Sequence, residues 1–315
     1  MTTKTLSPTS YAKPFLKWAG GKGQLIDEID LRPPQELKEG EIKTYIEPFI
    51  GGGAVFFHIA QKYPDIDDYI LIDVNKDLVN CYRAIQHRAE EVISELKLFE
   101  KLYFSHRTEE KKKKLFLEIR KLFNHEKDKS YSSQTAAKLI FLNKTCFNGL
   151  YRVNQKGMFN VPFGKYSKPN ICPEDNLKKV SNLLQKATIL CGDFSRCREY
   201  VDKNSFVYFD PPYRPISKTA SFTSYAKNSF SDEDQIRLAE FCKWLTKRNV
   251  KFLLSNSDPK NENPKDFFFE THYPESEGFI IDRVKASRAI NCKGDRRGQI
   301  NELLITNYEV TNDVC

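Results

Sequence analysis

The sequence has few of the residue patterns that hold metals or disulfide frameworks. Its 315 residues include eight cysteines, none of them in a C-x-x-C pair, and five histidines, none of them spaced as H-x-x-x-H. We therefore expect no metal site and no disulfide scaffold, and we interpret the cysteines as buried, reduced thiols.

Long apolar runs are missing as well. No stretch approaches the ~20 consecutive apolar residues of a membrane span, and the opening MTTKTLSPTS lacks the apolar core of a signal peptide. Hydrophobic residues make up 40% of the chain and charged residues 29%, which is typical of globular proteins. We expect a cytoplasmic protein with no membrane partner, built as one large domain or two modest ones.

Acidic residues are absent from residues 138–168, which hold six Lys or Arg. Residues 97–129 and 283–297 each carry a surplus of five positive charges, so the three windows sum to +16 in a chain whose net charge is +8. Charge gathered in this way favours a polyanionic partner. For EEKKKK at 109–114 we prefer a solvated helix face. For 138–168 we prefer a nucleic-acid contact, because aromatic and amide residues alternate with the charges.

Strand and helix patterns alternate along the chain. One helical pattern starts near Asn75, and another starts at Ser231, where Asp234 completes a pattern resembling a capping box. This alternation predicts an α/β domain with a mostly parallel sheet, interrupted from about 98 to 186 by a basic, helical insertion. The predicted strands are short apolar runs bounded by turn formers, at 43–50, 69–74, 187–194, 205–210 and 250–257. Two terminal strands are predicted at FIIDRV, 279–284, and INELLITNY, 300–308.

Three glycines, 51–53, follow the first predicted strand and would let the backbone approach a ligand closely. Asp73 ends the next strand, twenty residues after Gly53, where a carboxylate can accept hydrogen bonds from ribose hydroxyls. Taken singly, the glycines could form a plain turn and Asp73 could cap the following helix. Together they favour a nucleoside-containing cofactor at the strand ends. Upstream, Lys22 could pair with a carboxylate, and Trp18 could pack on a nucleoside or on the core.

The segment VYFDPPY, 207–213, ends a predicted strand at a carboxylate. Proline has no N–H to donate, so the strand must end at Phe209 or Asp210. A strand ended simply by two prolines would need neither Asp210 before them nor Tyr213 after them. The motif therefore indicates a chemical site.

Five motifs in this order, KWAGGK, EPFIGGG, IDVN, GDF and DPPY, resemble the Dam-type family of DNA adenine-N6 methyltransferases, close to its DpnM-like branch. The similarity runs from Pro14 to about Tyr308, and the motif order resembles the alpha group of amino-methyltransferases. It implies a Rossmann-like S-adenosylmethionine-dependent methyltransferase sheet in a catalytic domain of residues 1–97 and 187–315. An inserted, mostly helical target-recognition domain would occupy residues 98–186.

The resemblance implies site-specific transfer of the methyl group of S-adenosylmethionine to adenine N6 in double-stranded DNA, at a GATC-type site, by base flipping and direct in-line transfer. Asp210 and a main-chain carbonyl of the Pro211–Pro212 turn would accept the two N6 hydrogens and turn the nitrogen lone pair toward the methyl group. Tyr213 would stack on the extruded adenine. A separately acting restriction endonuclease is a partner that the resemblance allows.

The same resemblance assigns the remaining contacts. Phe147, Asn148, Leu150 and Arg152 lie on a predicted hairpin, in which Asn148–Gly149 can form the tight turn. Arg152 could grip guanine O6 and N7, and Phe147 could wedge into the base stack or belong to the core. Asp193 could instead be an ordinary turn residue, and Arg288 and Arg296 fit phosphate contacts better than base reading. The implied cofactor residues are Trp18, Lys22, Gly51, Gly53, Asp73, Asp193, Phe194 and Asp210; the implied DNA residues are Lys17, Phe147, Asn148, Leu150, Arg152, Pro162, Lys165, Arg288 and Arg296.

Two other classes of protein remain open at this point. An RNA or protein-glutamine methyltransferase would share the sheet and the Pro-Pro-Tyr motif, although the glutamine enzymes usually carry Asn where this chain has Asp210. A non-catalytic DNA-binding protein would account for the basic segments, but it would leave Asp73 and DPPY without a purpose.

Overall fold

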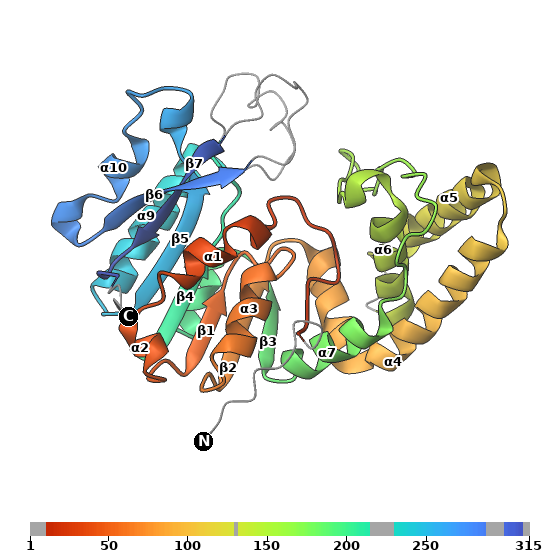
Figure 1. Cartoon of the computed structure of the whole chain (residues 1–315), viewed down its shortest axis with the longest axis horizontal. Helices are drawn as coiled ribbons and strands as arrows, with labels where there is room; N and C mark the ends of the chain where they lie inside the picture. Colours follow the sequence, from red (N-terminus) through yellow and green to blue (C-terminus); the bar gives the residue numbers. More distant parts are fainter. Residues whose placement is uncertain (1–10, 129–131, 215–229, 288–298, 311–315) are drawn as a thin grey trace. The chain divides into compact units, whose positions relative to one another are not determined.

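A computed structural model describes residues 11–128, 132–214, 230–287 and 299–310. Its centre is a seven-stranded sheet with the order β3-β2-β1-β4-β5-β7-β6 (Figure 1). The predicted strands are confirmed, at β1 (Thr44–Glu47), β2 (Asp68–Asp73), β3 (Ala187–Cys191), β4 (Ser205–Phe209) and β5 (Lys251–Ser257). The two predicted terminal strands are confirmed as well, at β6 (Ile280–Ser287) and β7 (Gln299–Thr306), and they complete the sheet. The α/β fold class that the sequence predicts is therefore correct.

The strand order reverses at β1. This strand pairs in parallel with β2 on one side and with β4 on the other, while β7 is antiparallel to both β5 and β6. The carboxyl ends of β2 and β4 therefore point to the same edge of the sheet. In open α/β sheets, ligands bind outside the carboxyl ends at such a reversal. The loops after β1, β2 and β4 are therefore the expected ligand-binding loops of this sheet.

Chain contacts divide the protein into two compact units, which we describe separately. The first unit comprises Met1–Gly21, Gly51–Lys62 and Asp73–Gly192, and the second comprises Lys22–Ile50, Tyr63–Ile72 and Asp193–Cys315. The predicted functional domains have other boundaries, and residue 97 lies inside a helix, α4 (Lys76–Ser105). The assignment of catalytic and recognition roles to domains stays a prediction.

The second unit contains most of the sheet. All five residues of β4 are buried, as expected for a strand covered on both faces. The helix α9 (Asp232–Thr246) packs against β5 and begins at the predicted capping box of Ser231 and Asp234, which is confirmed. The shorter helical elements of this unit are η2 (Lys22–Gln24), α1 (Ile26–Asp30), α2 (Gln35–Lys38), η4 (Phe194–Glu199), η5 (Pro259–Asn261), α10 (Phe268–His272) and η6 (Glu275–Glu277).

The first unit is mainly helical. Its long helix α4 starts after Asn75, whose side chain accepts a hydrogen bond from the Leu78 N–H, so the predicted helix start is confirmed. Arg88 has non-helical dihedral angles (φ −142°, ψ 36°), which mark a kink inside α4. The other elements are α3 (Ala54–Lys62), α5 (Glu109–Glu126), α6 (Ser133–Thr145), η3 (Phe147–Gly149), α7 (Glu174–Leu184) and β3.

Six cysteines within the described ranges are free thiols, and four of them are buried. Among the residues that the structure describes, no cluster of three or more His, Cys, Asp or Glu could hold a metal ion. No helix in the same ranges is both long and apolar enough to cross a membrane.

Candidate active site and DNA-contacting residues

Asp210 follows the last residue of β4, so the strand ends where the prolines require. Its Oδ1 lies 2.6 Å from the Lys22 ammonium nitrogen, in a pair whose side chains are only 5% (Lys22) and 20% (Asp210) exposed. The Ser255 hydroxyl, on the neighbouring strand β5, donates to the same oxygen at 3.3 Å. Lys22 does pair with a carboxylate, as the sequence suggested, and this carboxylate is that of the DPPY motif.

The environment of Asp210 shifts its ionisation. Burial raises the pKa of the Asp210 carboxyl; the Lys22 charge and the hydrogen bonds from Lys22 and Ser255 oppose this shift, and the nearby Glu302 adds to it. The net effect is a pKa above the ordinary value of an aspartate. Lys22 therefore favours the ionised form, which accepts hydrogen bonds, at a position where burial disfavours it.

Tyr213 is held by the same group of charges. Its hydroxyl donates to Glu302 Oε2 at 2.5 Å and accepts from the Lys22 ammonium at 2.7 Å. The ammonium also lies 4.3 Å from the centre of the Tyr213 ring. A base that stacked on this face would displace Lys22. Sequence reasoning missed Glu302 and Ser255, although an acid within the apolar strand INELLITNY was a signal for the first.

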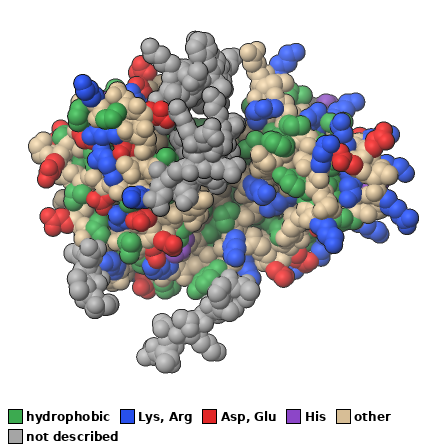
Figure 2. Space-filling view, turned by 45° about the horizontal axis from the view of Figure 1, so that its top comes forward, with side chains coloured by type: hydrophobic (Ala, Val, Ile, Leu, Met, Phe, Trp, Pro, Cys, Tyr) green, Lys and Arg blue, Asp and Glu red, His purple; other side chains and the backbone are tan. Residues whose placement is uncertain are grey.

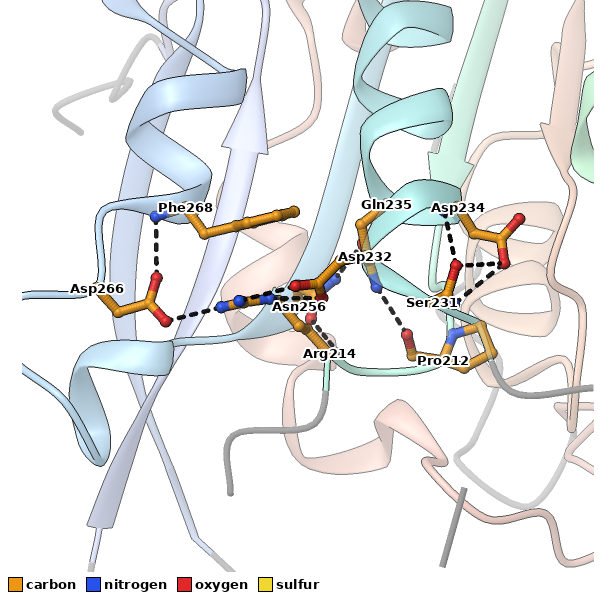
Figure 3. Close-up of polar contacts among 9 residues, drawn as sticks. All are labelled: Pro212, Arg214, Ser231, Asp232, Asp234, Gln235, Asn256, Asp266 and Phe268. Atoms are coloured by element: carbon orange, nitrogen blue, oxygen red, sulfur yellow. Dashed lines mark hydrogen bonds and ion pairs between the residues drawn. The ribbon is translucent and has the colours of Figure 1, made fainter. Parts of the chain in front are cut away.

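The Pro-Pro turn is tied to α9 (Figure 3). The Gln235 amide donates to the Pro212 carbonyl oxygen at 3.0 Å. No hydrogen bond among the described residues reaches the carbonyl oxygen of Pro211. The turn thus has one main-chain acceptor paired by a side chain and one without such a partner in the described ranges.

Asp193 and Phe194 have structural contacts of their own. The Asp193 carboxylate caps η4 by accepting from the Ser195 N–H, and it forms a two-point pair with Arg237 at 2.8 and 2.9 Å. Burial raises the pKa of Asp193, but Arg237 and Ser195 outweigh it and hold the pKa below its ordinary value. Phe194 is buried, and the Arg237 guanidinium lies 4.5 Å from the centre of its ring. The turn-residue interpretation of Asp193 therefore has direct support, and its cofactor role stays a prediction.

In the first unit, Asp73 fixes the glycine loop. Its carboxylate accepts the Gly51 N–H at 3.1 Å and the Asn75 N–H at 2.8 Å. Burial raises the pKa of Asp73, and these two N–H groups oppose the shift. The helix α4 is capped by Asn75 rather than by Asp73, so the simple capping interpretation of Asp73 is wrong.

The glycines of this loop are required by their surroundings. Gly51 and Gly53 have positive φ angles of 46° and 74°, and a side-chain Cβ on Gly51 or Gly52 would lie 3.0 or 3.2 Å from Trp18. Trp18 is half-buried and stacks on Tyr151, with ring centres 5.1 Å apart. The Tyr151 hydroxyl donates to Asp77 at 2.6 Å. Trp18 therefore lies between the glycine loop and the acid-free segment, a contact that sequence reasoning did not foresee.

Several predicted DNA residues gather around the end of α6. The Phe147 N–H donates to the Pro162 carbonyl, and the Asn148 N–H donates to the Tyr166 hydroxyl. Lys17 packs so closely on Gly149 that a side-chain Cβ there would collide with it. Phe147 is 52% exposed, so its assignment to the hydrophobic core is wrong. Asn143 and Tyr166, which sequence reasoning missed, hold this group together through main-chain hydrogen bonds.

The predicted hairpin lies further along the chain than expected. Asn148 and Gly149 do form a tight turn, with φ angles of 55° and 64°, but it follows α6 directly and joins no pair of strands. The chain reverses instead at 154–157, between Arg152 and Asn160. The exposed Arg152 guanidinium donates a hydrogen bond from Nε to the Asn160 Oδ1 at 2.8 Å. The position of the hairpin is corrected, and Arg152 lies at its base.

The surroundings of these residues are basic. Leu150, half-buried, links the tight turn to the hairpin. Lys165, exposed, has a positive φ of 58° and pairs with Glu109 at 2.9 Å. On the face drawn in Figure 2, Lys and Arg side chains are spread over the part of the first unit that carries α5 and α6. Arg288 and Arg296 lie outside the described residues.

This fold and these motifs define the class of protein. A mostly parallel sheet that reverses at β1, with a glycine turn after β1, an acid ending β2 and DPPY after β4, is the architecture of a Rossmann-like methyltransferase. The family model for D12 class N6 adenine-specific DNA methyltransferases matches residues 18–290, and the chain belongs to this family. It is an adenine-specific DNA methyltransferase, and the family's methyl donor is S-adenosylmethionine.

Individual relatives agree with this assignment over nearly the whole chain. The chain is 52% identical over 297 residues to a protein of Methanocaldococcus jannaschii named Type II methyltransferase M.MjaIII, covering 94% of this chain and 99% of the relative. It is 37% identical to the DNA adenine methylase of Vibrio cholerae (92% of this chain, 94% of the relative). It is 35% identical to the DNA adenine methylase of Escherichia coli (92% and 93%).

Proposed function

We propose that the protein methylates adenine N6 at a GATC-type site in duplex DNA, taking the base out of the helix and transferring the methyl group directly. The observation that carries this proposal is the half-buried Asp210 carboxylate at the end of β4, paired with Lys22 at 2.6 Å beside the Pro-Pro turn. A base brought here would meet one anionic and one main-chain acceptor.

The acceptors suit the chemistry of an exocyclic amine. Lys22 and Ser255 both bind Oδ1 of Asp210, and no hydrogen bond among the described residues reaches Oδ2. Oδ2 and the Pro211 carbonyl would each accept one N6 hydrogen, which turns the lone pair of the nitrogen away from the ring. The carboxylate also stabilises the positive charge that develops on N6 during transfer. Tyr213 would stack on the adenine once Lys22 has moved off its ring.

Residues of the glycine loop and of the strand ends would hold S-adenosylmethionine, which supplies a methyl group on a sulfonium. The residues present fit this group: Asp73 is an acceptor held in place by two main-chain N–H donors, and Gly51 and Gly52 leave room for the Trp18 ring beside the loop. Asp73 would accept the ribose hydroxyls. Trp18, Lys22, Gly51, Gly53, Asp193, Phe194 and Asp210 would provide the remaining contacts.

Target recognition would come from residues 98–186 together with Lys17. The exposed Phe147 would wedge into the stack that the base leaves, and Asn148, Leu150, Pro162 and Lys165 would contact the duplex beside it. Arg288 and Arg296 would contact phosphates. Since one relative is named a Type II methyltransferase, we include in the proposal a cognate restriction endonuclease that acts separately.

Arg152 is proposed to read a guanine next to the target adenine. Arg152→Ala should then relax discrimination at one base of the site by about 1–3 kcal/mol. The measurement is kcat/KM on duplexes in which GATC is altered one base at a time, for wild type and for Arg152→Ala. Lys156→Ala, an exposed change in the turn of the same hairpin, serves as the control. A uniform loss on every duplex would make Arg152 a phosphate contact and remove this support for GATC.

A further inference from the structure

Two buried amide side chains lie behind the Pro-Pro turn. Gln235 comes from α9 and is 1% exposed, while Asn256 comes from β5 and is fully buried. The Gln235 amide nitrogen donates to the Pro212 carbonyl at 3.0 Å, and the Asn256 amide nitrogen donates to the Gln235 amide oxygen at 3.2 Å. Figure 3 shows this chain of contacts running from the strand through the helix to the turn.

The direction of both amides is fixed by main-chain donors. The Asn256 oxygen accepts from the Ser257 N–H at 2.9 Å and from the Arg214 N–H at 3.4 Å, and these donors cannot be reversed. The nitrogen of Asn256 must therefore face Gln235, whose oxygen accepts from it. The Gln235 nitrogen is left to face Pro212. The two side chains thus present one N–H donor, in one orientation, to the carbonyl that follows the two prolines.

Arg214 fixes the chain immediately after the turn. Its guanidinium, 17% exposed, pairs at two points with Asp232 (2.8 and 3.0 Å) and at a third with Asp266 (2.8 Å). Its centre lies 4.2 Å from the centre of the Phe268 ring, and the Phe268 N–H in turn holds Asp266. Planar, bidentate and stacked contacts of this kind restrict arginine strongly. The segment that leaves DPPY is therefore held at Arg214, two residues after Pro212.

We propose that Gln235 is a positioning residue for methyl transfer: it holds the Pro212 carbonyl, so that the Pro211 carbonyl and Asp210 are presented together to adenine N6, and Asn256 orients its amide. This inference rests on the proposed function, because it assigns a task to the turn that the function requires. Gln235 touches neither substrate nor cofactor in this account. It acts through the geometry of the turn, where a displacement of about 1 Å is enough to slow a reaction severely.

The test uses Gln235→Glu, which keeps the size of the side chain, and Gln235→Leu, which removes both polar atoms. An ionised glutamate cannot donate to the Pro212 carbonyl, but a protonated one can. We expect both variants to lower the single-turnover rate by roughly ten- to a hundredfold. Affinity for S-adenosylmethionine and the fluorescence of 2-aminopurine at the target position, which reports base extrusion, should stay unchanged. The rate of Gln235→Glu relative to wild type should recover as the pH falls from 8 to 6, whereas that of Gln235→Leu should not.

Gln86→Leu is the matched control. Gln86 is also buried and donates to two main-chain carbonyls, those of Leu184 and Ala187, at 2.6 and 2.7 Å, but it lies in the other unit. It should lower the thermal stability and leave the single-turnover rate unchanged. A wild-type rate for Gln235→Glu at pH 8, or equal pH dependence of the two Gln235 variants, would overturn the positioning role. Failure of the wild-type protein to methylate adenine would instead overturn the proposed function itself.

Discussion

The ionisation of Asp210 links stability and activity at the scale of single residues. Its pKa is raised by burial, so the folded protein holds a proton on this carboxyl at pH values where the unfolded chain has lost it. The contribution of this group to stability is thus present at low pH and is lost as the pH rises through the raised pKa. Methyl transfer needs the ionised form, so its rate should increase as the pH rises through the pKa of Asp210.

The charge of Lys22 should set the pH at which Asp210 ionises. Lys22→Met removes the positive charge 2.6 Å from Asp210, so the pKa of the carboxyl should rise further. We expect the acidic limb of the single-turnover rate to move upward by about one pH unit or more. Lys260→Met, which removes an ammonium paired with Glu270 elsewhere in the same unit, is the control and should leave the limb in place. An unshifted limb in Lys22→Met would show that Asp210 does not control the rate.

Asp73 is proposed to bind the cofactor, whereas its neighbour Asn75 caps α4. Asp73→Ala should weaken the binding of S-adenosylmethionine by ~1.5–3 kcal/mol, because it removes a charged acceptor and releases the Gly51 N–H. Asn75→Ala removes the cap of α4 and should cost about 1 kcal/mol of stability without loss of cofactor affinity. Titration calorimetry separates the two effects. Equal cofactor affinity in wild type and Asp73→Ala would leave Asp73 with a purely structural role.

At the scale of elements, the strands could be predicted because each is a short apolar run with turn residues on both sides. All of β4 is buried, so its sequence SFVYF has no polar face to confuse the assignment. The starts of α4 and α9 were predictable for a local reason as well. In each, a short polar side chain accepts a hydrogen bond from the N–H three residues on, at Asn75 and at Ser231.

Contacts between distant elements could not be predicted in the same way. The Asn148–Gly149 turn is encoded locally, but whether strands flank it depends on pairing with 159–163, which the sequence does not specify. Glu302 reaches Tyr213 only because β7 folds back beside β5. Gln235 is one polar residue in an amphipathic helix, and its partner at Pro212 is 23 residues away. No regular spacing in the sequence identifies residues of this kind.

The end of α6 places two lysines close to each other. Burial, and then the charge of Lys17, lowers the pKa of Lys144 to about 8. Between this value and the ordinary lysine pKa the unfolded chain binds more protons, so the free energy of unfolding should rise with pH. Lys144→Met should therefore be more stable than wild type at pH 7, and this advantage should shrink by pH 9.5. Denaturant unfolding at the two pH values measures it; an advantage that does not change would contradict the lowered pKa of Lys144.

Across the whole molecule, positive charge is concentrated where the proposed function needs it. The net charge of +8 arises from three basic windows in a chain that is otherwise net acidic. One of them, 138–168, carries Phe147, Asn148 and Arg152, while the Asp210 site belongs to the other unit. These residues, proposed to recognise DNA, and the Asp210 site therefore belong to different units of the chain.

The most direct test of this account follows single-turnover transfer of a tritiated methyl group from S-adenosylmethionine to a duplex with one GATC site, by wild type and by Asp210→Asn. Analysis of the nucleosides identifies the product. We expect wild type to label only N6 of adenine. Asp210→Asn, which keeps the shape and removes the charge, should be slower by on the order of a thousandfold while its fold and cofactor affinity are retained. A rate near that of wild type in Asp210→Asn, or label in any other nucleoside, would contradict the proposed role of Asp210 or the proposed reaction.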